Sequence, residues 1–339
     1  MTKKIKIYSP YSGSYGISVI VDKLVDVFNK EGLSCEVINT LDGQAKDTLI
    51  IPYASDPAVE MIQKGFRTDI SFFTDAYSLG YKNKVFFSLK RLSVFNYDFI
   101  RSVGLYFIER IGERRVTSHF KNIVLVSDHD IKYLQENNKF CPNYFCLPNG
   151  APDPLVLPKT PADKIRLGIL SSWGHQSTAA ENGWFVTDYF KRYAKSHNNV
   201  ELILAGRGKF IEKYKGIEGV RVMGEVNDLN EFFSQTDMFI AVNPKGCGIL
   251  NRVLDAFAYK TFVLGHEASF TGFKYMKNCY MQFTNYASFE RTLDYAIGHP
   301  EIRTQFIENA TEAINMYNNW DVNIKKFINE VVRPVLNDY

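Results

Sequence analysis

The sequence predicts an α/β protein made of two tandem units, each a parallel sheet wrapped by helices. Runs that favour β-strands alternate with runs that favour helices along nearly the whole chain, which is typical of parallel strands joined by helices. Five prolines between residues 148 and 161 interrupt this alternation, which then resumes. The 339 residues are long for one domain and sufficient for two.

The first unit is expected over residues 1–155. It opens with a strand at residues 4–10, and its first strand-to-helix loop consists of Gly13, Ser14, Tyr15 and Gly16. Apolar residues recur at helical spacing from Ile20 to Phe28, which predicts a helix with one buried face. Gly32 is expected to end that helix. Further short β-rich runs are residues 35–39, 48–54, 70–76 and 122–128.

The second unit is expected over residues 156–315. Its predicted strands are residues 165–172, 200–206, 220–226, 238–244 and 261–265. From Glu301 to Leu336 the pattern is helical, and Ile314, Tyr317 and Trp320 are spaced for one face. Open parallel sheets bind ligands beyond the carboxyl ends of their strands. Two such edges facing each other across a cleft would suit a reaction with two substrates.

Composition excludes several classes of protein. The chain is 45% hydrophobic and 23% charged, which is too apolar for disorder, and its net charge of +3 does not favour a nucleic-acid partner. The cysteines show no metal-binding spacing and are expected to be free thiols; they are Cys35, Cys141, Cys146, Cys247 and Cys279. No signal peptide or membrane-spanning run is evident, so a cytoplasmic protein is expected, able to reach the inner face of the membrane.

The segment over residues 243–265 is the most informative. Gly246 and Gly248 flank Cys247, and a helix is expected to begin near Leu250. A glycine turn before a helix leaves backbone N–H groups open, with the positive end of the helix dipole behind them. This arrangement suits a diphosphate, although a purely structural glycine turn is the alternative.

Charged residues around this turn fit the same hypothesis. Lys245 and Arg252 could add positive charge beside a diphosphate. Asp255 lies within the first turns of the same helix, where its carboxylate could accept hydrogen bonds from a ribose diol.

The second half of the chain resembles the retaining GT-B glycosyltransferases of the large family 4 group, whose pattern is E-G-x-G-x-x-x-x-E-A-M-A-x-G-x-P-V. It is most similar to the sub-pattern G-x-G-I-x-N-K-V-L-E-A of polysaccharide-assembly members. The matching positions, with Arg for Lys and Asp for Glu, are Gly246, Gly248, Ile249, Asn251, Arg252, Val253, Leu254 and Asp255. Residues 204–208 and 223–226 resemble the turns that follow strands in the donor domain, and residues 126–127 and 148–150 resemble marks of the first domain.

The resemblance implies two facing Rossmann-like domains, with a C-terminal helix over residues 316–339 that packs back on the first. It implies transfer of a sugar from a nucleoside diphosphate to a glycan or lipid-linked glycan, with retention, in surface polysaccharide or glycoconjugate synthesis. The implied residues for the donor diphosphate are Lys245, Gly246, Cys247, Gly248, Ile249, Asn251 and Arg252. Those implied for ribose and base are Asp255, Arg207, Glu225 and Val226.

Two features depart from the family's pattern. Cys247 stands where the longer pattern has its first glutamate, and the loop over residues 171–176 lacks the usual Arg and Lys. Either Lys245, Arg252 and backbone amides hold the diphosphate instead, or the chain is a non-catalytic partner of an active transferase.

The acceptor side is expected on the first unit. Asp75 follows a predicted strand and could orient or deprotonate an acceptor hydroxyl, while a helix cap is the structural alternative. In retaining enzymes of this kind the leaving diphosphate is thought to help deprotonate the acceptor, which would spare a protein base. His129 is interpreted as a residue of a helix-capping region. The D-x-D spacing at residues 128–130 lies on the acceptor unit and is interpreted as chance, so neither metal nor cofactor is expected.

Residues 81–119 combine basic and aromatic side chains. The basic ones are Lys82, Lys84, Lys90, Arg91, Arg101, Arg110, Arg114 and Arg115, and the aromatic ones are Phe86, Phe87, Phe95, Tyr97, Phe99, Tyr106 and Phe107. The mixture suits peripheral contact with anionic lipid, and with it a lipid-linked acceptor. Core aromatics beneath a solvated basic face are the alternative.

Two other enzyme classes share parts of this pattern. A dinucleotide-dependent oxidoreductase should show G-x-G-x-x-G at its first turn and an acid about 20 residues later. The turn over residues 13–16 matches that motif poorly, although Glu36 lies at a suitable distance. A nucleotide-sugar epimerase also has two domains and would need acids and histidines in its cleft, and the six histidines of the chain leave it open.

Overall fold

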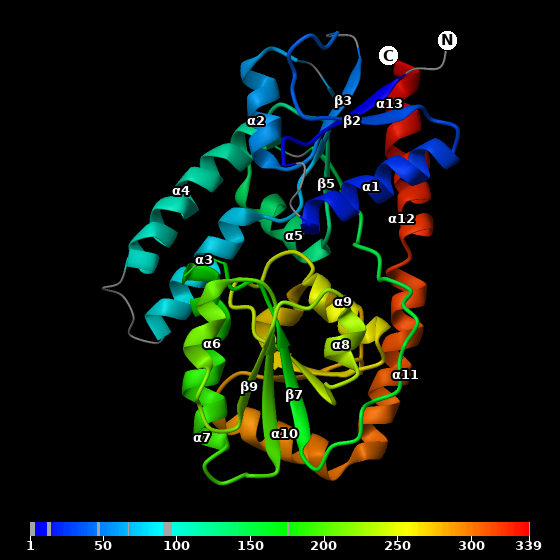
Figure 1. Ribbon diagram of the computed structural model, residues 1–339. Helices are drawn as coiled ribbons and strands as arrows, with labels where there is room; N and C mark the ends of the chain where they lie inside the picture. The colour runs from blue at the N-terminus through cyan, green and yellow to red at the C-terminus, as the bar shows by residue number, and fades with distance from the viewer. Residues whose placement is uncertain are drawn as a thin grey trace. The chain divides into compact units, whose positions relative to one another are not determined.

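A computed structural model describes residues 4–11, 15–45, 48–66, 68–90, 97–140, 142–174 and 176–338. The chain forms parallel sheets covered by helices, which confirms the α/β fold class (Figure 1). It divides into two units. The first comprises Met1–Gly150, Cys247–Ile249 and Tyr317–Tyr339, and the second comprises Ala151–Gly246 and Leu250–Met316.

The first unit has two small parallel sheets. One has the order β2-β1-β3, from β1 (Ile5–Tyr8), β2 (Cys35–Ile38) and β3 (Leu49–Pro52). The other has the order β4-β5-β6, from β4 (Ile70–Phe72), β5 (Asn122–Leu125) and β6 (Asn143–Cys146). A single parallel bridge between Tyr53 and Phe72 connects the two sheets. Four of these strands after the first were predicted, whereas the short β6 was missed.

Helices follow the strands of the first unit. They are α1 (Tyr15–Lys30), α2 (Ser55–Gln63), α3 (Tyr77–Lys90), α4 (Tyr97–Thr117) and α5 (Asp128–Asn137). The predicted apolar face of α1 is buried, including Leu24 and Val27, and Gly32 after it has a φ of 78°. Because a positive φ is open to glycine at little cost, Gly32 can turn the chain out of the helix.

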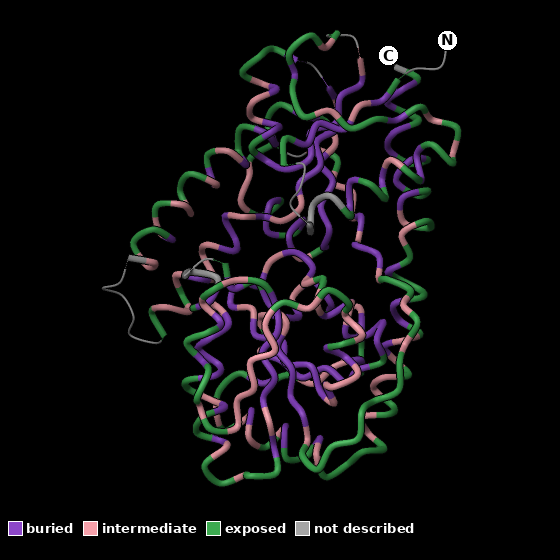
Figure 2. Tube along the Cα trace, viewed as in Figure 1, coloured by how far each residue is buried: buried purple, intermediate pink, exposed green. Residues whose placement is uncertain are grey.

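The second unit is built on one sheet of six parallel strands, in the order β12-β11-β10-β7-β8-β9. The strands are β7 (Ile165–Leu170), β8 (Val200–Ala205), β9 (Val220–Gly224), β10 (Met238–Ala241), β11 (Phe262–His266) and β12 (Met281–Phe283). Figure 2 shows the middle of this sheet as buried, and β10 is buried along its whole length. Such strands read as continuous apolar runs because helices cover both sheet faces.

The helices of the second unit are α6 (Gln176–Trp184), α7 (Lys191–Tyr193), α8 (Leu229–Phe233), α9 (Asn251–Ala258), α10 (Tyr286–Gly298) and α11 (Pro300–Tyr317). A π-helical turn, Phe185–Phe190, joins α6 to α7. Two 3-10 turns lie at Lys209–Tyr214 and Glu267–Phe273. The start of α9 at Asn251 confirms the helix expected near Leu250.

The final helical segment is interrupted. α11 ends at Tyr317, and α12 (Trp320–Phe327) begins after Asn319, whose side chain accepts a hydrogen bond from the N–H of Val322 at 3.1 Å. A π-helical turn, Ile328–Val332, and α13 (Arg333–Asp338) complete the chain. The prediction of one helical face through Ile314, Tyr317 and Trp320 is therefore wrong, because the cap at Asn319 starts a new helix.

α12 packs on the core of the first unit. The ring of Phe327 meets those of Phe28, Phe72 and Phe145, with centroids 5.6 to 6.4 Å apart. Trp320 covers Gly150 so closely that any side chain there would collide with the indole. Among the described residues no helix combines the length and apolar character needed to cross a bilayer.

Candidate functional site

Four loops of the second unit begin at the carboxyl ends of neighbouring strands. They follow β10, β7, β8 and β9 in sheet order and comprise residues 242–246, 171–174, 206–208 and 225–228. Because the strands are parallel, these loops share one edge of the sheet, where open α/β sheets bind their ligands. We call this set of loops the donor edge.

Glycine and tryptophan hold the donor edge together. Trp173 is buried, its indole N–H donates to the carbonyl of Ala205 at 2.9 Å, and its backbone N–H donates to the carbonyl of Arg207 at 2.7 Å. Gly206 and Gly208 have φ values of 121° and 129°, and a side chain on Gly208 would collide with the backbone of residues 173–174. The A-G-x-G turn is therefore shaped by close backbone packing that only glycine permits.

Arg252 anchors the start of α9 to the donor edge. Its guanidinium donates from Nη1 to the Oγ of Ser171, 3.1 Å away, which joins the helix to the loop after β7. Burial lowers the pKa of Arg252, and the nearby carboxylates of Asp255 and Glu181 oppose that shift. A guanidinium remains protonated in proteins, so Arg252 supplies a fixed positive charge here.

Asp255 lies one turn further along α9. Burial raises its pKa to about 6, and the attraction of Arg252 keeps it from rising further. At neutral pH the carboxylate is mostly ionised and can accept hydrogen bonds from hydroxyl groups. The structure thus places Asp255, predicted to bind the ribose, next to Arg252, predicted to bind the diphosphate.

Two further cations of the donor edge are paired with carboxylates. Lys245 Nζ lies 3.6 Å from the Oε2 of Glu181, which is on α6. Arg207 Nε lies 3.8 Å from the Oε1 of Glu225 across the ends of β8 and β9, and both side chains are exposed. Val226, also assigned to the nucleotide, is half-buried after β9. The exposed pair of Arg207 and Glu225 is of a weak kind that a ligand can rearrange.

The glycine turn offers fewer amides than expected. Gly246 and Gly248 have φ values of 55° and 63°, as a turn reserved for glycine requires. The N–H of Lys245 donates to Asn243 Oδ1 at 3.0 Å, and that of Gly248 donates to both carboxylate oxygens of Asp130 at 3.0 and 3.1 Å. The expectation of open N–H groups is therefore wrong for these two positions.

Asp130, which the sequence analysis treated as part of a chance spacing, is a central buried acid of the first unit. Besides Gly248, it accepts hydrogen bonds from the N–H of Ala76 at 2.8 Å and from Ser127 Oγ at 3.0 Å. Its side chain is fully buried, and burial raises its pKa while these donors oppose the rise. Asp130 fixes the loop that carries Asp75, and only the fold could bring these segments together.

Asp75 lies beyond β4, at the carboxyl edge of the first unit. Its carboxylate stands so close to Gly248 that a side chain there would collide with it. α3 begins at Tyr77, and the residue directly before it is Ala76 rather than Asp75. The hydroxyl of Tyr53, close enough to Asp75 for its charge to act on the tyrosine pKa, is buried without a hydrogen-bond partner in the described structure. Tyr53 was not predicted as a site residue, because its sequence position is that of an ordinary strand residue.

The remaining candidates are placed as follows. Gly13, Ser14 and Ser12 lie outside the described residues, as does His175, while Tyr15 and Gly16 begin α1. Cys247 is half-buried and packs with an apolar cluster of the first unit that includes Phe73 and Leu79. Ile249 is buried and Asn251 is exposed. His129 lies in the first turn of α5, capped by Ser127, as the interpretation of a capping region requires.

Two expectations concern metal ligands and thiols. In the part of the chain that the structure describes, no group of three or more His, Cys, Asp or Glu side chains is placed to hold a metal ion. Cys35, Cys146, Cys247 and Cys279 are free thiols, and Cys141 lies outside the described residues.

Part of the second unit matches a known family model. Residues 169–277 match the family described as glycosyl transferases group 1, a stretch that contains Ser171, Arg207 and Arg252. No curated protein sequence matches the chain significantly.

Solved structures share the fold over almost the entire chain. Sucrose-phosphate synthase from Thermosynechococcus elongatus matches 99% of this chain and 100% of its own, with a TM-score of 0.72 and 12% identity. HepE from Anabaena, in complex with UDP, matches 98% and 100%, with a TM-score of 0.65 and 12% identity. A glycosyltransferase from Rickettsia africae matches 100% of both chains, with a TM-score of 0.62 and 13% identity.

At such identities the solved structures establish the fold, which is GT-B with two Rossmann-like domains. The family match covers the segment that forms the donor edge. The chain therefore has the GT-B fold, and its residues 169–277 match the group 1 glycosyl transferases.

Proposed function

We propose that this protein transfers a sugar from a nucleoside diphosphate to a hydroxyl of a glycan or lipid-linked glycan, with retention of anomeric configuration and without a metal ion. The observation that carries the proposal is the pairing of Arg252 with Ser171 at the start of α9, within the group 1 match. A half-buried guanidinium at that place can bind a diphosphate through two parallel hydrogen bonds.

The donor diphosphate would lie at the N-terminus of α9. Leu250, at the cap position, makes no side-chain cap, so its side chain does not compete with a ligand for the positive end of this helix. Arg252 and Lys245 add positive charge beside the helix dipole. These groups would stabilise the charge that develops on the leaving diphosphate, which is the role that a metal ion fills in other transferases.

The nucleoside would extend along the donor edge. Asp255 would accept hydrogen bonds from the ribose diol, because its carboxylate is mostly ionised at neutral pH. Arg207, Glu225 and Val226 would lie near the base. UDP is the first nucleotide to test, because HepE holds UDP.

The acceptor hydroxyl would bind at the carboxyl edge of the first unit. Asp75 would orient it, and the unpartnered hydroxyl of Tyr53 would supply a further hydrogen bond. In the reaction, the acceptor oxygen bonds to the anomeric carbon while the bond from that carbon to the diphosphate oxygen breaks. The acceptor proton passes to the diphosphate that leaves. The transferred sugar would become part of a surface polysaccharide or another glycoconjugate.

Thermal unfolding with UDP, GDP, ADP, CMP and NAD(P), each with Mg²⁺ and with EDTA, tests the donor. A ligand at 100 times its dissociation constant should stabilise the fold by about 2.7 kcal/mol. A shift with one nucleoside diphosphate that is the same in EDTA supports the proposal. A shift that needs Mg²⁺, or one with NAD(P) alone, contradicts it. The anomeric configuration of the product, measured by NMR with the matching sugar donor, then tests retention.

A further inference from the structure

α4 differs from an ordinary surface helix in that its buried side is polar and its exposed side is apolar. Its buried positions are largely polar and include Ser102, Arg110, Glu113 and Thr117. Its exposed positions include Ile100, Phe107, Ile108 and Ile111, with exposed fractions of 67%, 59%, 64% and 67%. A surface helix of a globular protein normally buries its apolar stripe and exposes its polar one.

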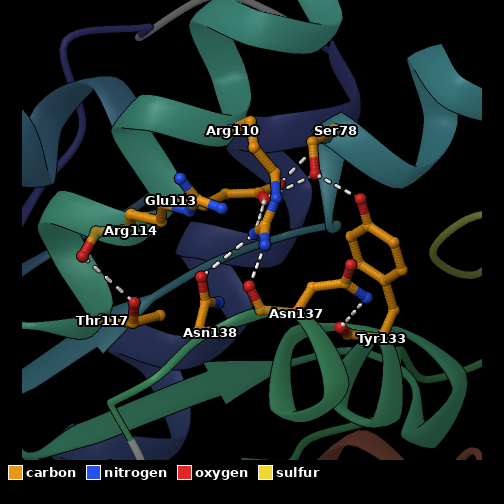
Figure 3. Close-up of polar contacts among 8 residues, drawn as sticks. All are labelled: Ser78, Arg110, Glu113, Arg114, Thr117, Tyr133, Asn137 and Asn138. Atoms are coloured by element: carbon orange, nitrogen blue, oxygen red, sulfur yellow. Dashed lines mark hydrogen bonds and ion pairs between the residues drawn. The ribbon is translucent and has the colours of Figure 1, made fainter.

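A buried polar network holds α4 in this orientation (Figure 3). Glu113 accepts hydrogen bonds from the N–H and the Oγ of Ser78, at 2.9 and 2.5 Å, and so ties α4 to the first turn of α3. Arg110 donates to Asn138 Oδ1 at 3.0 Å and to the carbonyl of Asn137, which ties α4 to the end of α5. Turning the helix about its axis would break these buried bonds at a high cost.

The exposed residues lie on one side of α4. They recur at helical spacing, and we call them the α4 outer face: Ile100, Arg101, Gly104, Phe107, Ile108, Ile111, Arg114 and Arg115. From Arg101 to Arg115 the helix rises about 20 Å. Figure 2 shows stretches of exposed residues along this helix. An exposed apolar stripe of this length indicates an interaction surface.

The charges on α4 are sorted by sign. The exposed ones are Arg101 near its beginning and Arg114 and Arg115 near its end, on either side of the apolar stripe. Its acidic residues, Asp98, Glu109 and Glu113, are half-buried or buried. The outer face therefore presents apolar side chains and positive charge without exposed negative charge.

We infer that the α4 outer face binds the surface of an anionic lipid bilayer, with the helix lying flat. Isoleucine and phenylalanine side chains would enter the boundary between headgroups and acyl chains, and the three arginines would pair with anionic headgroups. A second copy of this chain fits less well, because a symmetric contact would bring arginines together with no exposed carboxylate of α4 to pair with them.

This inference sharpens the sequence hypothesis for residues 81–119. Lys84 and Arg110 are buried and do not belong to a basic face, and Arg91 and Phe95 lie outside the described residues. The isoleucines that make up much of the apolar stripe were not among the residues singled out. The inference goes beyond the proposed function in assigning the surface on which the enzyme would meet a lipid-linked acceptor.

Sedimentation of the full chain with vesicles tests the inference, without nucleotide and without any measure of activity. One set of vesicles is phosphatidylcholine, and the other is phosphatidylcholine mixed with phosphatidylglycerol. We expect binding to the mixed vesicles, weaker binding to phosphatidylcholine alone, and release at high salt, because salt screens the arginine contribution.

Substitutions on the outer face give the sharper result. Ile108→Glu with Ile111→Glu should weaken binding to mixed vesicles at least about ten-fold, because burial of both side chains is lost. Val322→Glu, at an exposed valine of α12, is the matched control and should bind as the natural chain does.

Arginine substitutions provide an independent measurement should the double glutamate variant fail to fold. Arg114→Gln and Arg115→Gln should each weaken binding about five-fold. Lys132→Gln, at an exposed lysine of α5, is their control. No binding of the natural chain to mixed vesicles, or equal binding by outer-face and control variants, overturns the inference. So does a dimer in solution that Ile108→Glu with Ile111→Glu converts to a monomer, since a second copy would then cover the face. Nucleotide binding is measured separately, so neither result decides the other.

Discussion

Replacing Arg252 with alanine tests the donor site most directly. The guanidinium lies at the first turn of α9 and bonds Ser171 across the donor edge. If it also bonds the diphosphate, its loss removes a hydrogen bond to a charged group, worth about 1.5 to 3 kcal/mol. The dissociation constant for the nucleoside diphosphate should therefore rise about 10- to 150-fold.

The electrostatics of the neighbouring acid add to this effect. Arg252 restrains the pKa of Asp255, which burial has raised to about 6. Without the guanidinium that pKa should rise further, so a larger fraction of Asp255 is protonated at neutral pH. A protonated acid accepts fewer hydrogen bonds from a ribose diol, and affinity in Arg252→Ala should therefore improve as the pH is raised.

Isothermal titration calorimetry of purified variants at one ionic strength measures this prediction. Arg252→Lys keeps the charge without the forked geometry and should lose less affinity than Arg252→Ala. Lys215→Ala, at an exposed lysine paired with Glu212, should bind as the natural chain does. Equal affinity in Arg252→Ala and the natural chain would refute the placement of the diphosphate at this helix.

Three further outcomes follow from the same contacts. Because the folded-state pKa of Asp255 lies near 6, above its unfolded value, the free energy of unfolding should fall as pH rises from about 4 to 6, and Asp255→Asn should flatten that slope in denaturant titrations. Asp130→Asn puts an amide against buried N–H donors and should lower the free energy of unfolding by about 2 to 4 kcal/mol, while Asp163→Asn on the exposed linker should leave it unchanged. Gly208→Ala places a methyl group against neighbouring backbone and should lower the free energy of unfolding more than Gly216→Ala, because Gly216 also has a positive φ but has open space around it. Equal losses in the two variants would show that the strain of a positive φ, and not the collision, sets the cost.

Local patterns in the sequence were enough to predict the α/β fold class. Strand runs such as residues 200–206 and 238–244 are continuous apolar segments, and a buried parallel strand produces that pattern whatever its neighbours are. The glycine turn before α9 was also visible, because a positive φ can be met at little cost by glycine alone. Short edge strands such as β6 and β12 were not predicted, because so few residues carry too little periodicity to indicate a strand.

The composition of the candidate site was only partly predictable. Arg252 and Asp255 could be named because their spacing on one helix follows from the chain itself. The tie between Arg252 and Ser171 joins residues far apart in sequence, and only the packing of parallel strands brings them to one edge. Asp130 and Tyr53 were missed for the same reason, because their importance lies in what surrounds them rather than in their type.

The sequence by itself determined the alternating α/β architecture and the glycine turn, because both depend on backbone preferences and local periodicity. Tertiary structure alone decided which amides are already bonded, which charges are paired, and which side of α4 faces outward. Those properties depend on partners distant in the chain, and burial among those partners sets both the pKa values and the orientation of the helix. The outward face of α4 shows this most plainly, since apolar residues at helical spacing ordinarily indicate a buried face, and here the buried network of α4 turns its isoleucines outward.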